Sequence, residues 1–479
     1  MPKLWHLLIF ELDLNFELRV LNFLSLMPIN IIPMLKRLLK KILPKPLLST
    51  YHFTLALLAA LFYRFPSRRM IVIGVTGTTG KTTTSYLIAQ LLELAGFKTG
   101  LSSTAIFKVG EKEWLNDKKM TMLGRLQTQK LLRQMVRAGC AYAVIETSSE
   151  GILQHRQVGI HYDSLVFTNL SPEHLEAHGG FDNYKKTKLK LFKNLARAKN
   201  KVIGGRKIPR TIIANLDSEH AADFLNFKVD QKITYSLNAK LTGVEPQPLL
   251  AAEVQSSAAG LNFKINGRNF HSPLLGDFNA YNNLAAVAVL CSQNISLEAA
   301  AKLLPETKPC PGRMEIIQAG QPFTVVVDYA FEPKAMANLY QTILKLKPAN
   351  GKIIHVLGGT GGGRDKARRP VIGGIAGQNA DLVIVTNEDP YDEDPAEIIN
   401  QVAQGVRQKG KVENQTFWKI SDRREAIHKA LSLAKANDLV LITGKGSEQA
   451  IAVKNGKLLP WDDRVVVKEE IKKMAENNF

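Results

Sequence analysis

The residues from Met70 to Gly96 limit most strongly what this chain can fold into. The apolar run MIVIGV is typical of a buried strand, and SYLIAQLLELAG is typical of a helix. Between them lies TGTTGKTTT, which is too rich in glycine and threonine to extend either element. In such a turn, backbone N–H groups and the positive end of the following helix point at one place. The sequence therefore predicts a phosphate-binding loop.

This loop carries the residue types that hold nucleotide phosphates, although its spacing differs from the common G-x-x-x-x-G-K-[ST] pattern. Val75, and not a glycine, stands five positions before Gly80. Lys81 would meet the β- and γ-phosphates, and the hydroxyl of Thr82 would bind Mg²⁺. A glycine-rich turn without a ligand is the alternative. The predicted phosphate-binding residues are Gly77, Thr78, Thr79, Gly80, Lys81, Thr82 and Thr83.

Two α/β series follow one another along the chain. Strand-like runs alternate with helical stretches over 127–138 and 184–198, which predicts a parallel sheet with crossover helices. Residues 240–275 alternate apolar and polar side chains and predict a β-rich insertion. After a proline-rich segment at 305–315, four more strand-like runs predict a second, Rossmann-like unit.

A chain of 479 residues is too long for one ordinary core, so several domains are expected. We predict an α/β protein with a short helical N-terminal region, a P-loop central domain with a parallel sheet, and a C-terminal Rossmann-like α/β domain. The expected boundaries are 1–66, 67–310 and 311–479.

The first 65 residues differ from the rest in composition. MLKRLLKKILPK places lysine and arginine between apolar residues at helical spacing, which predicts a basic amphipathic helix. The uncharged run at 47–63 falls short of the roughly 20 apolar residues that cross a bilayer. We predict an interfacial or packed hairpin over 34–63, which allows peripheral membrane contact; a transmembrane helix and a simple cover over the sheet are the alternatives. Met34 is an alternative start to Met1.

The formal net charge of +20 indicates either a polyanionic partner or a solvated lysine-rich surface. No nucleic-acid-binding motif occurs and only 7% of residues are aromatic, so we expect no nucleic acid partner. Anionic lipid or a phosphorylated substrate remains. The three cysteines show no metal-binding spacing and no disulfide framework, which suits the cytoplasm, with membrane association left open.

Two further segments place polar residues where strands end. VIETSSEGILQHR ends a strand at Glu146, where a carboxylate can complete a magnesium shell. VFTNLSPEHLEAHGG leaves another strand with His174 and His178 in a loop, at the edge where open α/β sheets bind ligands. In order along the chain, GTTGKTTT, ETSS…QHR, FTNLSPEH and YKKTKLKLF resemble the Mur ligase family. GDFNAYNNLAA, GRME, DYAFEP, GGGRDKARRP and GKGSE extend the resemblance over nearly all of 70–464, with the greatest likeness to the MurE branch.

The resemblance implies an ATP-dependent carbon–nitrogen ligase of cytoplasmic peptidoglycan precursor synthesis, and hence of cell-wall growth, cell shape and division. It would act as a monomer and join a free amino acid to UDP-N-acetylmuramoyl-L-Ala-D-Glu through an acyl phosphate. Its cofactors would be ATP, two Mg²⁺ ions and a carbamylated Lys188. Two alternatives remain: a related ligase, such as a folylpolyglutamate-type enzyme or one with a lipid-linked acceptor, and a nucleotide-binding scaffold without catalysis.

The resemblance also implies roles for individual residues. The implied catalytic residues are Lys81, His174 and Lys188. The implied metal ligands are Thr82, Glu146, His174 and Lys188. Asn279 and Asn282 would lie near the adenine, and Arg313 and Asp328 near the phosphate and ribose. The implied substrate contacts are Thr121, Ser148, Gln154, Arg156, Asp389, Gly444 and Glu448.

Four positions depart from the family pattern. Phe331, Ser447 and Glu150 stand where the family has histidine. EDPY at 388–391 lacks the arginine that would pair with the distal carboxylate of diaminopimelate. The acidic run from Glu388 to Asp394 either favours a cationic amino acid such as lysine or is a solvated loop. The N-terminal region also replaces the domain that helps to hold the uridine nucleotide, which leaves uridine recognition and the amino acid open.

Overall fold

The computed structural model describes residues 45–173, 178–238, 248–363 and 366–476. The chain divides into two compact units, Met1–Leu55 and Ala56–Phe479. In the first unit the structure describes only the beginning of helix α3 (Lys45–Phe62). The basic helix predicted around Met34 lies outside the described residues. Within the described part of the chain, no helix is long and apolar enough to cross a membrane.

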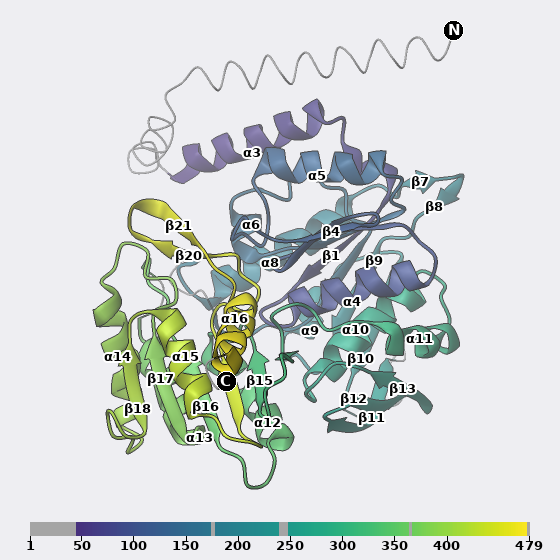
Figure 1. Cartoon of the computed structure of the whole chain (residues 1–479). Helices are drawn as coiled ribbons and strands as arrows, with labels where there is room; N and C mark the ends of the chain where they lie inside the picture. Colours follow the sequence, from purple (N-terminus) through teal and green to yellow (C-terminus); the bar gives the residue numbers. More distant parts are fainter. Residues whose placement is uncertain (1–44, 174–177, 239–247, 364–365, 477–479) are drawn as a thin grey trace. The chain divides into compact units, whose positions relative to one another are not determined.

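An 11-stranded sheet organises the first part of the second unit, in the order β13-β12-β11-β10-β9-β6-β1-β5-β2-β3-β4 (Figure 1). Its central strands pair in parallel, as predicted. These strands are β1 (Ile71–Thr76), β2 (Thr99–Ser102), β5 (Tyr142–Glu146), β6 (Ser164–Phe167), β9 (Thr211–Asn215) and β10 (Gln231–Ser236). Helices cover both faces of these strands, and β1, β5 and β6 are accordingly largely apolar runs.

Antiparallel strands extend this sheet at both edges. The predicted β-rich segment forms β11 (Leu249–Ser257), β12 (Gly260–Ile265) and β13 (Arg268–Ser272), and β11 pairs in parallel with β10, so the segment continues the main sheet. At the other edge, β3 (Ile106–Val109) and β4 (Lys112–Leu115) form a hairpin.

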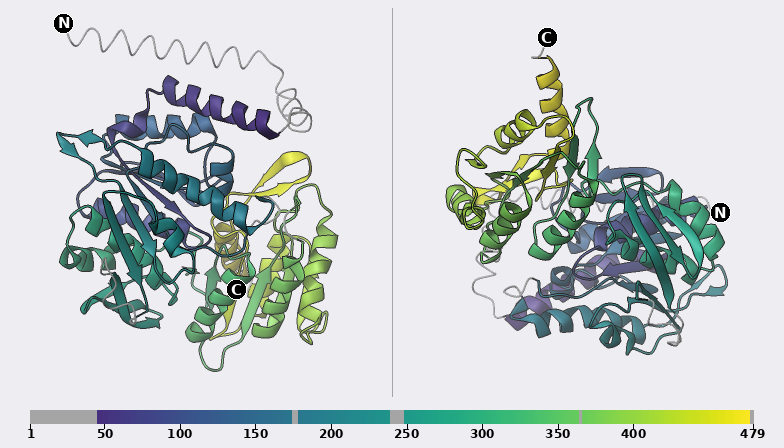
Figure 2. Two further views of the ribbon diagram at one scale, coloured as in Figure 1. Left: turned by 180° about the vertical axis from the view of Figure 1, so that it is seen from behind. Right: turned by 90° about the horizontal axis from the view of Figure 1, so that it is seen from below.

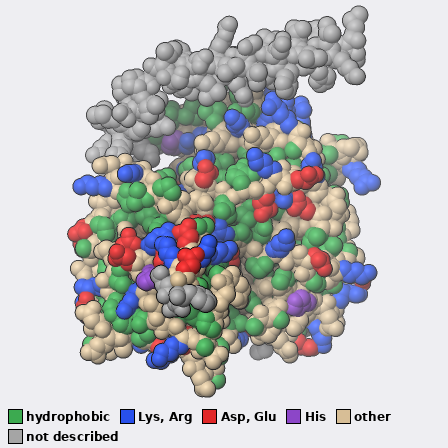
Figure 3. Space-filling view, viewed as in Figure 1, with side chains coloured by type: hydrophobic (Ala, Val, Ile, Leu, Met, Phe, Trp, Pro, Cys, Tyr) green, Lys and Arg blue, Asp and Glu red, His purple; other side chains and the backbone are tan. Residues whose placement is uncertain are grey.

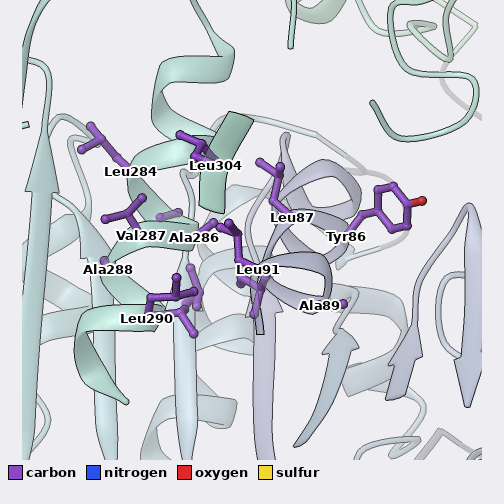
Figure 4. Packing of buried hydrophobic residues seen from close by; sticks show 14 of the residues in the cluster. Tyr86, Leu87, Ala89, Leu91, Leu284, Ala286, Val287, Ala288, Leu290 and Leu304 are labelled. Carbon is purple, nitrogen blue, oxygen red and sulfur yellow. The ribbon is translucent and has the colours of Figure 1, made fainter. Parts of the chain in front are cut away.

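Two hydrophobic cores lie on the two faces of the sheet. On one face, α4 (Lys81–Leu94), α10 (Asn279–Ser292) and α11 (Leu297–Leu303) pack together. Figure 4 shows the leucines of α4 and the apolar side chains of α10 turned toward one another. α4 is buried almost all round, which fixes the phosphate loop at its N-terminus. The other face is covered by α5 (Arg125–Arg137), α6 (Ser149–Leu153), α8 (Phe181–Arg197) and α9 (Ala221–Leu225).

A six-stranded sheet organises the C-terminal part, in the order β14-β15-β19-β16-β17-β18. The four predicted strands are β15 (Thr324–Val327), β16 (Ile353–Leu357), β17 (Leu382–Thr386) and β19 (Leu439–Ile442), and all pair in parallel. The edge strands β14 (Glu315–Ile317) and β18 (Phe417–Ile420) were not predicted from the sequence. A hairpin of β20 (Ala450–Val453) and β21 (Lys457–Pro460) follows β19.

Helices cover both faces of this second sheet as well (Figure 2). One face carries α12 (Pro333–Leu346), α13 (Arg368–Asn379) and α14 (Pro395–Arg407). The other carries α15 (Arg423–Leu433) and α16 (Asp463–Glu476). On the face shown in Figure 3, acidic and basic side chains mix around α16, where Arg424 pairs with Glu469 and Glu470. The predicted α/β class with a Rossmann-like C-terminal sheet is confirmed.

The chain crosses between the two sheets over a very short stretch. Cys310 is 1% exposed and belongs to the core around α4 and α10. Gly312 has a φ of +65°, and a Cβ there would lie 2.1 Å from the backbone nitrogen of Ser447. Only glycine fits this close approach, so the crossing runs between Cys310 and Gly312.

The buried imidazole of His355 predicts an acid-dependent loss of stability. Its ring nitrogens meet Tyr340 Oη at 2.7 Å and Thr443 Oγ1 at 2.9 Å. Burial, and then the charge of Arg423, lowers the pKa of His355 from 6.5 to about 3. Below pH 6.5 the unfolded chain therefore binds a proton that the folded chain does not bind. His355 thus lowers the free energy of unfolding by about 1.4 kcal/mol per pH unit as the pH falls through this window.

As the pH falls from 6.5 to about 5, we expect the free energy of unfolding to decrease less for His355→Gln than for the unaltered chain. Glutamine keeps a donor and an acceptor for Tyr340 and Thr443 but does not titrate. Urea unfolding at a series of pH values measures the difference. Equal slopes for the two proteins would show that His355 is protonated in the folded state.

Candidate active site

The predicted phosphate loop joins β1 to α4 and is held by a neighbouring loop. Thr78 donates its backbone N–H to the carbonyl of Asn169 at 3.0 Å, and Thr79 donates its own to Asn169 Oδ1 at 2.9 Å. Gly80, at the N-terminus of α4, has a φ of +79°. Lys81 Nζ donates to the Thr78 carbonyl at 2.6 Å, so the lysine head lies over the loop. These contacts fix the loop where a helix N-terminus favours anions.

Glu146 ends β5 beside the loop, as predicted for a magnesium ligand. The carboxylate is 1% exposed and lies 3.1 Å from Thr82 Oγ1, through either oxygen. It also accepts from the backbone N–H of Thr104 at 2.7 Å and from the Thr104 hydroxyl at 3.0 Å. The sequence analysis missed Thr104, which lies far from Glu146 in the chain and belongs to no motif.

Thr82 and Glu146 form a donor set that fits Mg²⁺. Within the described ranges, no three histidine, cysteine or carboxylate side chains gather into a closed metal cage. A hydroxyl and a single carboxylate leave coordination positions for phosphate oxygens and water, which is how proteins commonly hold Mg²⁺. His174, the predicted ligand of a second ion, lies outside the described residues. His178 is described, and its Nε2 lies 3.1 Å from Ser149 Oγ.

Lys188 lies on α8 beneath the phosphate loop. Its Nζ donates to the carbonyl of Gly77 at 2.8 Å and lies 4.7 Å from the centre of the Tyr184 ring. The residue is 1% exposed. Burial, and then the charge of Lys81, holds the pKa of Lys188 well below its usual range. The structure therefore brings Lys188 to the loop and favours its neutral amine.

Of the two asparagines predicted near the adenine, Asn282 contacts the start of α4 and Asn279 holds Asn282 in place. Thr84 donates its hydroxyl to Asn282 Oδ1 at 3.1 Å, and Asn282 Nδ2 donates to Asn279 Oδ1 at 2.6 Å. A Cβ on Gly80 would lie 2.4 Å from Asn282 Oδ1, so the absence of a side chain at Gly80 lets Asn282 approach this closely. Both asparagines start α10, and packing of α10 on α4 positions them.

Arg313 and Asp328 lie on the C-terminal side of the crossing. The Arg313 guanidinium lies 4.1 Å from the centre of the Tyr329 ring. Asp328 is buried and accepts backbone N–H groups from Met314 and Ala330, each at 2.7 Å. Burial raises the pKa of this carboxyl, against the effect of Arg313 and the N–H donors.

The predicted substrate contacts divide into two groups, and the first surrounds α6. Ser148 caps α6 by accepting from Gly151 N at 3.1 Å. Arg156 donates to Gln154 Oε1 at 2.7 Å and to the carbonyl of Met122. The hydroxyls of Thr104 and Thr121, the residue before Met122, lie 2.9 Å apart, and Thr104 also donates to Glu146. This hydrogen-bonded chain connects the first group to the predicted metal ligand.

The second group is a buried set of charges that we call the four-charge cluster: Lys119, Asp389, Lys445 and Glu448. Lys445 Nζ lies 3.0 Å from Asp389 and 2.5 Å from Glu448, and Lys119 Nζ lies 2.6 Å from Asp389 and 3.2 Å from Glu448. Burial opposes the charge of Lys445, but Glu448 and Asp389 outweigh it and raise its pKa. The cluster is internally neutral and joins the two sheets' loops.

Asp389 and Glu448 were predicted site residues, but neither lysine of the cluster was. Lys445 stands inside the GKGSE motif and could have been noticed there, whereas Lys119 carries no local signal. Gly444, assigned to the same site, has a φ of +104°, and a Cβ there would lie 2.5 Å from Glu388 Oε2. Glycine is thus required for the approach of Glu388.

The departures from the family pattern are accommodated in the fold. The ring of Phe331 packs edge-on against Tyr329, and the Arg368 guanidinium lies 5.1 Å from its centre while pairing with Glu332. Ser447 is 3% exposed. Glu150 accepts from Gln154 Nε2 at 2.8 Å.

The acidic run at 388–394 is neither wholly solvated nor wholly a binding site. Glu388 and Asp389 are buried, and Glu388 accepts from Thr360 Oγ1 at 2.6 Å. Glu393 pairs with Arg369, and Asp394 caps α14. The run therefore stabilises its own loop, and through Asp389 it also forms part of the four-charge cluster.

Comparison with known proteins follows the same division of the chain. Residues 75–290 match the family model of the Mur ligase middle domain, and residues 312–446 match that of the Mur ligase, glutamate ligase domain. A UDP-N-acetylmuramyl-tripeptide synthetase from Roseiflexus sp. (strain RS-1) is 40% identical over 85% of this chain and 80% of its own length. A UDP-N-acetylmuramoyl-L-alanyl-D-glutamate--2,6-diaminopimelate ligase from Geobacillus kaustophilus (strain HTA426) is 34% identical over 90% and 84%.

Solved structures superpose over most of the chain. A UDP-N-acetylmuramoyl-L-alanyl-D-glutamate--2,6-diaminopimelate ligase superposes with a TM-score of 0.55 at 31% identity, covering 85% of this chain and 79% of that one. Folylpolyglutamate synthase from Mycobacterium tuberculosis shares the fold. It superposes with a TM-score of 0.60 at 16% identity, covering 80% of this chain and 90% of that one. Since tripeptide synthetases and diaminopimelate ligases match at 34–40% identity over most of the chain, this protein belongs to the Mur ligase family, which is ATP-dependent.

Proposed function

We propose that this chain is a MurE-type ligase that adds the third amino acid to UDP-N-acetylmuramoyl-L-Ala-D-Glu, with hydrolysis of ATP to ADP and phosphate. One observation carries the proposal: the phosphate loop, Glu146 and the buried Lys188 meet at one edge of the parallel sheet. The likeness to a tripeptide synthetase at 40% identity supports the choice of branch.

The residues around the loop would activate the acceptor carboxylate. Backbone N–H groups of Gly80 and Lys81 and the Lys81 ammonium would hold the transferring phosphate and stabilise its charge. Thr82 and Glu146 would hold one Mg²⁺, and His174 and Lys188 a second; the ions would supply charge neutralisation between anionic reactants. The acceptor carboxylate attacks the γ-phosphate and ADP leaves. The amine of the free amino acid then attacks the acyl carbon, and phosphate leaves.

Lys188 would serve this site as a carbamate. A neutral lysine amine adds to CO₂ and releases a proton, which gives an anionic oxygen ligand of the kind that Mg²⁺ prefers. The lowered pKa of Lys188 supports this assignment because it raises the share of neutral amine, the form that reacts with CO₂.

The substrate would lie along the two groups described above. Ser148, Gln154, Arg156 and Thr121 would contact the sugar nucleotide, and the four-charge cluster with Gly444 the incoming amino acid. Lys119 and Lys445 already neutralise Asp389 and Glu448, so these carboxylates would orient the amino acid without offering excess negative charge.

We also propose that the enzyme acts as a monomer in the cytoplasm and touches the membrane through residues 34–63. Its domain boundaries would lie at 66/67 and 310/311, and the short crossing after Cys310 supports the second of them.

The test is a mass-spectrometric coupling assay. The full chain, ATP, Mg²⁺ and UDP-N-acetylmuramoyl-L-Ala-D-Glu are offered a mixture of amino acids, and a product heavier by one residue is expected. Lys81→Met should lower the rate by at least about a hundredfold, because the lysine stabilises the transferring phosphate. ADP without a product would point to another acceptor, and no ADP from the unaltered chain would contradict the proposal.

A further inference from the structure

Helix α3 buries its small side chains and exposes its large apolar ones. Ala56, Ala59 and Ala60 are at most 2% exposed, and a Cβ on Gly159 would lie only 2.3 Å from that of Ala60. Leu58 and Leu61, on the other side of the same helix, are 55% and 52% exposed. A helix that only covered the protein would turn its leucines inward. The outer face of α3 is therefore suited to an apolar partner.

A second exposed element, at the right edge of Figure 1, is tied to the segment that follows α3. It is the hairpin of β7 (Val202–Ile203) and β8 (Arg206–Lys207), in which Val202 is 69% exposed. Lys201 anchors this hairpin, since its Nζ donates to the carbonyls of Ser67 at 2.7 Å and Met70 at 2.8 Å. Two apolar projections thus share one side of the protein.

Cations surround these projections. The exposed cations are Arg64, Arg68, Arg69, Lys199, Arg206 and Lys207. The neighbouring acidic residues Asp163 and Asp230 form ion pairs with other cations, Lys201 and Arg210 respectively, and not with the exposed cations named above. The sequence contains no aspartate or glutamate between Glu17 and Glu93. This side of the chain therefore carries a large excess of positive charge.

An open pocket of about 590 Å³ lies beside the hairpin, at the segment that follows α3. Phe65, Arg68, Gly159–His161 and Lys199–Val202 line it. The Arg68 guanidinium lies 4.5 Å from the centre of the Phe65 ring, which holds a cation at the pocket. Burial, and then the charges of Lys201 and Arg68, lowers the pKa of His161, as expected of a positive environment. The pocket has the size and charge for a phosphate headgroup.

We propose that the outer face of α3 and the β7–β8 hairpin dock together on a bilayer of anionic phospholipid. Leu57, Leu58, Leu61 and Val202 enter the boundary between headgroups and acyl chains, and the surrounding cations bind headgroup phosphates. A second copy is a poorer occupant, because the same cations would face one another across the contact. The proposal extends the membrane contact proposed for residues 34–63 to the body of the protein, and vesicle binding tests it independently of ligase activity.

The experiment is co-sedimentation of the full chain with vesicles of phosphatidylcholine alone or mixed with phosphatidylglycerol. We expect binding to the mixed vesicles only. Leu58→Asp with Leu61→Asp, and separately Arg206→Glu with Lys207→Glu, should each weaken binding by at least about tenfold. The matched controls are Leu344→Asp, at a leucine that is 49% exposed on α12, and Lys302→Glu with Lys308→Glu; both should bind within about twofold of the unaltered chain.

Thermal unfolding confirms that each variant is folded, and coupling of the UDP-linked substrate should be unchanged in all of them. Equal binding to phosphatidylcholine alone would overturn the proposal. So would full binding by the hairpin variant, which would assign the contact to residues 1–44. Loss of a dimer on Leu58→Asp with Leu61→Asp, seen by sedimentation velocity without vesicle binding, would assign the face to a second copy.

Discussion

Lys188→Ala is expected to abolish most of the ATP-dependent coupling, with a loss of about 10²–10³-fold in kcat, the size of effect that follows loss of a charge-stabilising group. The side chain is buried against the carbonyl of Gly77, next to the bound phosphates of the proposed reaction. Removing it would take away a ligand of the proposed second Mg²⁺. The coupling assay at saturating Mg²⁺ and ATP measures the loss.

Lys188→Arg separates the proposed carbamate from a structural role. Arginine keeps a cation that can donate to the carbonyl of Gly77, but it does not form a carbamate near pH 7. If the carbamate is required, Lys188→Arg is as inactive as Lys188→Ala. Near-normal activity of the arginine variant would contradict the carbamate and leave only the hydrogen bond. Labelled bicarbonate gives a second readout, since a carbamate signal is expected from the unaltered chain alone.

Lys445→Met is expected to lower the free energy of unfolding by about 3–5 kcal/mol, the cost of leaving buried carboxylates without their partner. Lys445 is fully buried between Asp389 and Glu448. Methionine fills a similar volume, so the loss reports charge and not a cavity. Urea unfolding followed by tryptophan fluorescence measures it.

The chain offers a matched control for this variant. Lys185 and Asp223 form an ion pair at the same 3.0 Å separation as Lys445 and Asp389, but near the surface. Lys185→Met should cost at most about 1 kcal/mol, because solvent screens that pair. Equal losses in the two variants would contradict the role given to burial. Adding Glu448→Gln to Lys445→Met should recover part of the loss, since it removes one unpaired charge.

The parts of the site that lie near one another in the chain were predictable from sequence. Gly80, Lys81 and Thr82 are consecutive, and their strand–turn–helix setting already predicts the phosphate loop. Glu146 was also predictable, because β5 is parallel to β1 and its last residue must lie at the same edge of the sheet. Strands such as β1, β5, β17 and β19 were found for a similar reason, because each is a largely apolar run; β2 and β10 are not apolar runs and were not predicted.

Contacts between distant segments could not be predicted in this way. Lys119 and Asp389 are 270 positions apart, and DKKM is an unremarkable polar run. Thr104 is found only after β2 and β5 are placed side by side. β18 is a short edge strand whose sequence, FWKI, shows no long apolar run. The role of the acidic run at 388–394 could not be decided from sequence. Asp389 is buried and Asp392 is exposed, but nothing in the local sequence distinguishes the two.

The crossing between Cys310 and Gly312 has a consequence for protein engineering. Cys310 belongs to the core around α4 and α10, and Gly312 already packs against Gly446 and Ser447 in the loop after β19. Chimeras that exchange C-terminal halves among family members must therefore be joined at Pro311, and they must carry the partner glycines at 312 and 446 together. A junction placed only a few residues away would combine the 310–312 segment of one parent with the 446–447 loop of another. We expect such hybrids to misfold, because the close approach of Gly312 to this loop would be lost.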